Sequence, residues 1–126
     1  GVYADLLSNK MAEHGSTAWL INTGWSGGSY GVGNRMKIKY TRAMLNAALD
    51  GELEDVEYIV DDRFGFDIPK SCPGVPSDVL IPKQTWDDSN AYDATADKLA
   101  AMFNDNFERY AAGVSDEVNA AAPVVN

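Results

Sequence analysis

Residues 24–33 restrict the fold of this chain more than any other segment, because they hold five of its eleven glycines. The segment reads Gly-Trp-Ser-Gly-Gly-Ser-Tyr-Gly-Val-Gly. Glycine weakens helices and strands and readily adopts the backbone angles of tight turns. The segment therefore predicts a flexible loop between two regular elements.

A cluster of positive charge follows this loop directly. Arg35, Lys37, Lys39 and Arg42 lie here, and residues 15–49 contain no Asp or Glu. These residues carry +4, so the rest of the chain carries −13 in a total of −9. Flexible backbone beside isolated positive charge favours an anion site, above all for a phosphate-bearing ligand.

Length and composition predict one folded domain. The chain has 126 residues, of which 45% are hydrophobic. Its net negative charge argues against general nucleic-acid binding and against docking on an anionic membrane. The single cysteine excludes an intrachain disulfide, which fits a cytoplasmic location. No transmembrane or signal segment is expected, and the start without Met predicts a piece of a longer protein.

Hydrophobic periodicity predicts three helices. The first covers residues 2–14 and ends at Gly15, and the second covers 40–50 and ends at Gly51. The third carries an apolar stripe that we interpret as core, and Gly113 caps it. The residues of the stripe are Tyr92, Ala96, Leu99, Phe103, Phe107 and Tyr110.

The remaining segments predict short strands and loops. The apolar run at 18–22 is typical of a buried strand, and alternation at 56–60 indicates a half-exposed one. Residues 64–68 fit a second short strand or a bend. Four prolines in residues 69–84 predict an irregular surface segment, and residues 113–126 a loosely ordered tail. The expected fold class is α/β in the mixed α+β sense, with short strands and three helices.

The glycine loop does not complete a known phosphate motif. Residues 28–33 have the glycine spacing of a phosphate-binding loop, but Asn34-Arg35 replaces the required Lys-Ser/Thr. A dinucleotide fingerprint fails because Met36 stands where Gly or Ala is needed. Arg35 can stack on a flat ring or bind phosphate oxygens, or it is a solvated surface residue. Thr41 lies near a helix start, as a ligand contact or as a plain N-cap.

The residues offer no catalytic or metal-binding constellation. Cys72 has no histidine after it and is interpreted as a turn residue rather than a nucleophile. His14 is the only histidine, so a zinc site has no support. The pairs Asp61-Asp62 and Asp87-Asp88 are interpreted as solvated loop residues. We therefore expect no catalytic residue and no metal ligand in this chain.

One family has these motifs in this order. Leu20-Ile-Asn-Thr-Gly-Trp25, Gly27–Gly33 and Arg35–Met44 resemble the C-terminal region of ATP-dependent phosphoenolpyruvate carboxykinase. The resemblance continues through Ile68–Pro76 and Phe103–Phe107, and it covers nearly the whole chain.

The resemblance implies that residues 1–126 are the C-terminal portion of that enzyme's nucleotide-binding domain. The family converts oxaloacetate and ATP to phosphoenolpyruvate, ADP and carbon dioxide in gluconeogenesis, with Mg²⁺ and often Mn²⁺. Its phosphate loop, metal ligands and substrate arginines lie upstream of the matching region. By motif position, Arg35 and Met36 match residues that flank the adenine, and Thr41 matches a threonine that contacts the nucleotide.

Two other functions stay open at this point. The chain is a self-sufficient, non-enzymatic module for an anion or nucleotide, or it is a scaffold whose basic cluster only offsets the surrounding acid. As an enzyme segment it is expected to be inactive alone, because it brings neither phosphate loop nor metal. An exposed apolar face would make the isolated segment self-associate.

Overall fold

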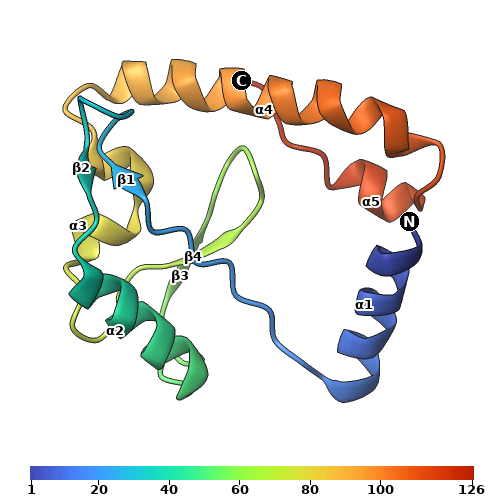
Figure 1. Ribbon diagram of the computed structural model, residues 1–126, viewed down its shortest axis with the longest axis horizontal. Coiled ribbons are helices and arrows are strands. Elements are labelled where there is room, and N and C mark those ends of the chain that lie inside the picture. The colour runs from blue at the N-terminus through green and yellow to red at the C-terminus, as the bar shows by residue number, and fades with distance from the viewer.

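The computed structural model describes all residues 1–126 and has a mixed α+β architecture, which confirms the expected fold class (Figure 1). The α-helices are α1 (Val2–His14), α2 (Ile38–Leu49), α3 (Ser77–Leu80), α4 (Ser89–Ala111) and α5 (Asp116–Ala120). The strands β1 (Trp25–Ser26) and β2 (Asn34–Arg35) form one antiparallel sheet, and β3 (Tyr58–Val60) and β4 (Asp67–Pro69) form the other. A 3₁₀ helix, η1, covers Pro82–Thr85.

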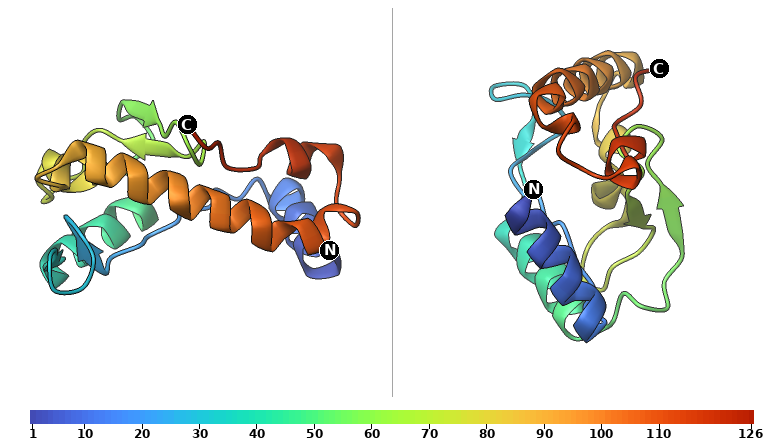
Figure 2. Two further views of the ribbon diagram at one scale, coloured as in Figure 1. Left: turned by 90° about the horizontal axis from the view of Figure 1, so that it is seen from above. Right: turned by 90° about the vertical axis from the view of Figure 1, so that its right-hand side faces the viewer.

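All three helices predicted from periodicity are present. Gly15 ends α1 in the left-handed conformation, with a φ of 60°, which glycine adopts without a Cβ clash. The carboxylate of Asp88 caps α4 by accepting hydrogen bonds from the amides of Asn90 and Ala91. Figure 2 shows α4 running along the length of the molecule, with α1 near one end and α2 near the other. No helix is both long and apolar enough to cross a membrane.

The core of this chain is small and lies beneath α2. Only six of the 126 residues are buried. Four of them form one cluster: Ala47 of α2, Leu53, Cys72 and Val75. Half-buried side chains from the segment before the glycine loop and from α3 pack around this cluster, among them Trp19, Val79 and Leu80. The chain therefore leaves most of its apolar surface without a partner.

Half of the apolar stripe of α4 is exposed, so its interpretation as core holds only in part for this chain. Leu99 is 44% exposed, Phe103 52% and Tyr110 50%. Only Ala96 and Ala100 of this helix are buried. The periodicity identified the apolar face correctly, and these 126 residues cover only part of it: Phe64 packs edge-to-face on Phe103, and Trp86 packs on Tyr92.

Helix α1 also leaves its apolar residues exposed. None of its residues is buried, and Tyr3 is 88% exposed. An amphipathic helix gains most of its stability in a protein by packing an apolar face against another element. Helix α1 makes no such packing within this chain.

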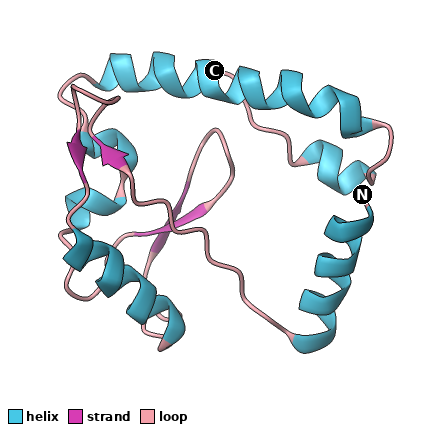
Figure 3. Cartoon of the chain, in the orientation of Figure 1, coloured by secondary structure: helices cyan, strands magenta, loops and turns pink.

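The predicted strand at 18–22 is absent. Figure 3 shows this segment as part of the long connection between α1 and β1, and no backbone hydrogen bond joins residues 17–23 to any other residue. A strand needs a neighbour that accepts and donates its ladder of hydrogen bonds, and this chain offers none here. The second predicted strand is shorter than expected and pairs with β4. In the predicted segment 64–68 both alternatives occur, because the chain turns through Gly65, whose φ is 66°, before β4 begins at Asp67.

Two segments expected to be irregular contain short helices. Residues 69–84 include α3 and the start of η1, where Pro82 occupies the first helical position, which tolerates its missing N–H. Residues 113–126, which we expected to be loose, include α5. The Asn104 amide donates to the carbonyl of Pro123, and the amide of Val124 donates to the carbonyl of Arg63. These long-range bonds hold the C-terminal segment against α4 and the β3–β4 turn.

Candidate functional site

The glycine loop is the connection of a small β-hairpin. Trp25 pairs with Arg35 and Ser26 with Asn34 across β1 and β2. The backbone amide of Met36 donates a hydrogen bond to the carbonyl oxygen of Gly24, with an N···O distance of 3.0 Å, and this bond closes the base of the loop. The hairpin ends at Arg35, three positions before α2 begins at Ile38, so its conformation fixes where the chain enters that helix.

Two glycines allow close backbone packing within the loop. A Cβ on Gly33 would lie 2.5 Å from the carbonyl oxygen of Ser26 and 2.6 Å from that of Gly28. A Cβ on Gly27 would lie 2.6 Å from the carbonyl oxygen of Thr85 in η1. Real Cβ atoms do not approach backbone atoms this closely, so both positions require glycine. The loop is therefore closed on itself and rests against η1.

The structure places the three predicted nucleotide residues along the connection from β2 to α2. Arg35 ends β2 and is exposed, whereas Met36 directly after it is half-buried. Thr41 lies in the first part of α2 and is half-buried. Its interpretation as a plain N-cap is wrong, because the N-cap is Lys37, which makes no side-chain capping bond.

The positive charges of this site have no acidic partner. The ion pairs of the chain involve Lys10, His14, Arg63, Lys70 and Lys83, and none involves a cation of residues 35–42. The first amides of α2 also lack helical acceptors, and the helix dipole adds positive potential there. The connection from β2 to α2 can therefore accept an anion without first breaking an ion pair.

Three other candidate residues, Asp61, Asp88 and Cys72, have structural roles. Asp61 accepts hydrogen bonds from the amides of Arg63 and Phe64, and Asp88 caps α4. Cys72 is buried in the core, and this burial raises the pKa of its thiol, which disfavours the thiolate nucleophile. No three His, Cys, Asp or Glu side chains come together where they could hold a metal ion. The side chains of this chain therefore do not form a complete Mg²⁺ or Mn²⁺ site by themselves.

Sequence reasoning missed an ionic network around Arg63. Nε of its guanidinium donates a hydrogen bond to Oδ1 of Asp97 at a distance of 2.6 Å, and Nη2 lies 3.4 Å from Oδ1 of Asp93. The hydrogen bond from Arg63 holds the pKa of the Asp97 carboxyl below its ordinary value. Lys83 also binds Asp93, over 2.7 Å. The sequence contained one signal of this network: Asp93 and Asp97 are four residues apart, so they lie on the same face of α4.

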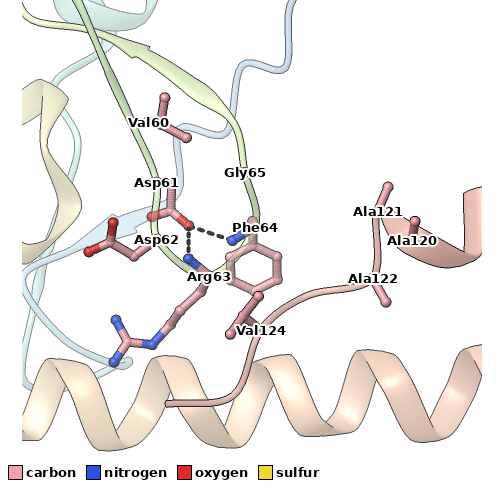
Figure 4. A pocket seen from close by; sticks show the side chains of 10 residues that line it. All are labelled: Val60, Asp61, Asp62, Arg63, Phe64, Gly65, Ala120, Ala121, Ala122 and Val124. Atoms are coloured by element: carbon pink, nitrogen blue, oxygen red, sulfur yellow. Dashed lines mark hydrogen bonds between the residues drawn. The ribbon is translucent and has the colours of Figure 1, made fainter. Parts of the chain in front are cut away.

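A cavity of about 460 Å³ lies beside this network, between the β3–β4 turn and the C-terminal segment (Figure 4). Val60, Phe64 and Val124 contribute apolar walls, and Arg63 extends from the turn toward α4. None of the three predicted nucleotide residues lines it. The cavity is thus separate from the glycine loop.

The chain is an α+β protein in which a glycine-rich hairpin leads into a helix whose first cations have no acidic partner. A family model described as phosphoenolpyruvate carboxykinase matches residues 1–78. The chain belongs to the ATP-dependent phosphoenolpyruvate carboxykinase family.

Curated proteins agree with this family model. The protein named phosphoenolpyruvate carboxykinase (ATP) from Ruegeria sp. (strain TM1040) is 56% identical over 121 residues, which are 96% of this chain. The protein of the same name from Geotalea uraniireducens (strain Rf4) is 58% identical over 117 residues, or 93% of this chain. Phosphoenolpyruvate carboxykinase (ATP) 2 from Moorella thermoacetica is 53% identical over 98% of the chain. This chain spans 22–23% of the length of these relatives.

Proposed function

We propose that this chain supplies the adenine and ribose side of the ATP site in an ATP-dependent phosphoenolpyruvate carboxykinase. Arg35 and Met36 flank the adenine, and Thr41 contacts the nucleotide. The observation that carries the proposal is the exposed Arg35, which no carboxylate pairs, on a closed glycine hairpin. A guanidinium in this setting can stack on a purine ring or donate to an anionic oxygen.

The chemical step belongs to the rest of the enzyme. The family reaction converts oxaloacetate and ATP to phosphoenolpyruvate, ADP and carbon dioxide, and phosphoryl transfer depends on positioning and on charge neutralisation by metal ions. This chain brings together no three side chains that could hold a metal ion, and it has no complete phosphate loop. Residues outside the chain therefore bind the phosphates, Mg²⁺, Mn²⁺ and oxaloacetate, and the isolated chain is inactive.

Titration calorimetry of the isolated chain with Mg-ATP tests this division. We expect weak or undetectable binding, because the phosphates carry most of the charge of ATP and their ligands lie elsewhere. The full-length enzyme should bind Mg-ATP and form phosphoenolpyruvate from oxaloacetate. Binding of Mg-ATP by the isolated chain at low micromolar concentration, lost in Arg35→Ala, would instead support the self-sufficient nucleotide-binding module.

We also propose that the isolated chain self-associates through the exposed face of α4. Leu99, Met102 and Phe103 line a groove of about 240 Å³ on this face, and exposed apolar patches of this kind promote association. Sedimentation velocity should show dimers or larger species at about 100 µM, a concentration at which weak association is measurable.

The variant Phe103→Glu should shift this equilibrium toward the monomer, because it places a charge on the apolar face. Gln84→Glu is the matched control, since it adds the same charge at an exposed polar position. A monomeric unmodified chain at this concentration would contradict the proposal, and so would equal effects of the two variants.

A further inference from the structure

Trp25 and Arg35 lie directly opposite each other in the β1–β2 hairpin. Side chains of opposite residues project from the same face of an antiparallel sheet. The bond from the Met36 amide to the Gly24 carbonyl flanks this pair, which is typical of a non-hydrogen-bonded pair with a Cα separation of about 4.5 Å. The indole and the guanidinium therefore leave the sheet side by side.

The indole is held in place but remains open to solvent. Tyr30, at the tip of the loop, contacts Trp25 with a ring separation of 5.1 Å and an interplanar angle of 80°. This edge-to-face contact stabilises the position of the indole. Trp25 nevertheless stays 46% exposed.

The other two tryptophans differ from Trp25. Trp19 packs near Tyr58 and joins the core beneath α2, and Trp86 contacts Tyr92 at the start of α4. Both are half-buried, whereas Trp25 is exposed. Packing within this chain therefore explains the positions of Trp19 and Trp86. The indole of Trp25, next to Arg35, presents a flat apolar surface that this packing does not explain.

We propose that Trp25 stacks on the adenine ring of ATP and that Tyr30 holds the indole in the stacking position. This inference rests on the proposed nucleotide site and adds two residues to it. The ring of a base has a π-face that an aromatic side chain can cover, and such stacking makes a substantial contribution to binding. Arg35 lies close enough in the hairpin to contact the same ring from its edge or the adjoining ribose.

The experiment compares two ligands on the full-length enzyme, Mg-ATP and inorganic tripolyphosphate, which has the phosphates but no base. In Trp25→Leu, which keeps an apolar side chain and removes the ring, the KM for ATP should rise about tenfold. The inhibition constant of tripolyphosphate should stay unchanged, and kcat should change much less than KM. In Trp25→Phe, which keeps an aromatic face, the KM for ATP should stay within about threefold.

Three results would overturn the inference in distinguishable ways. Equal weakening of ATP and tripolyphosphate by Trp25→Leu would mean that Trp25 only shapes the loop. A normal KM in Trp25→Leu beside a raised KM in Arg35→Ala would leave the proposed nucleotide site standing without stacking. A normal KM in both variants would contradict the nucleotide site as well.

Discussion

Replacing Arg35 by alanine in the full-length enzyme is expected to raise the KM for ATP by about ten- to a hundredfold, the range of a lost hydrogen bond from a charged group. The structure leaves this guanidinium exposed and without an acidic partner, so the substitution breaks no ion pair of the chain and removes only the proposed contact with ATP. Steady-state kinetics at saturating oxaloacetate measures the effect. The value of kcat should fall less, because the proposed contact of Arg35 is with the end of ATP that does not react.

Two further substitutions separate the contact from the charge. Arg109→Ala removes the same charge from an exposed position in the last turn of α4, outside the basic cluster, and should change the KM for ATP by less than about twofold, as a screened charge does. Arg35→Lys keeps the charge but loses the planar group with several donors, so its KM should lie between those of the wild type and Arg35→Ala. An unchanged KM in Arg35→Ala would favour the scaffold interpretation, in which the basic cluster only offsets nearby acid.

Local sequence signals predicted the elements whose causes are local. Periodicity and a C-terminal glycine predicted α1, and the glycine-rich composition predicted the loop between β1 and β2. The run at 18–22 has the side chains of a buried strand but no neighbouring strand in this chain, so it has no ladder to join. The face of Leu99 and Phe103 is apolar as predicted, but its burial depends on what lies across from it.

In the candidate site, too, the sequence predicted local features but not contacts that depend on the folded conformation. The residues suggested a basic cluster near Arg35, and the family resemblance assigned roles to Met36 and Thr41, which stay predictions. Neither indicated that Gly33 packs against two carbonyls of its own loop, because that contact depends on the closed conformation. The network of Arg63 with Asp97 joins residues 34 positions apart, and charge spacing along a chain does not specify such a pair.

Replacing Gly33 by alanine is expected to weaken ATP binding to the full-length enzyme by about tenfold or more. The new Cβ would lie 2.5 Å from the Ser26 carbonyl oxygen and 2.6 Å from that of Gly28, and both are backbone atoms that cannot turn away. Overpacking of this kind costs about 1–3 kcal/mol. The closed hairpin, and with it the position of Arg35, then becomes less populated, and apparent affinity falls by the same fraction.

Gly24→Ala is the matched control, because it makes the same chemical change in the same loop. Neither glycine has a positive φ, so backbone strain does not distinguish them. A Cβ at Gly24 meets no atom within 4 Å, whereas a Cβ at Gly33 meets two carbonyls. The KM for ATP should therefore rise only in Gly33→Ala, while both variants melt within a few degrees of the wild type, as a local change in a large enzyme should. Equal KM values in the two variants would show that ATP binding does not depend on the closed hairpin, and Arg35 would then have to reach the nucleotide from a mobile loop.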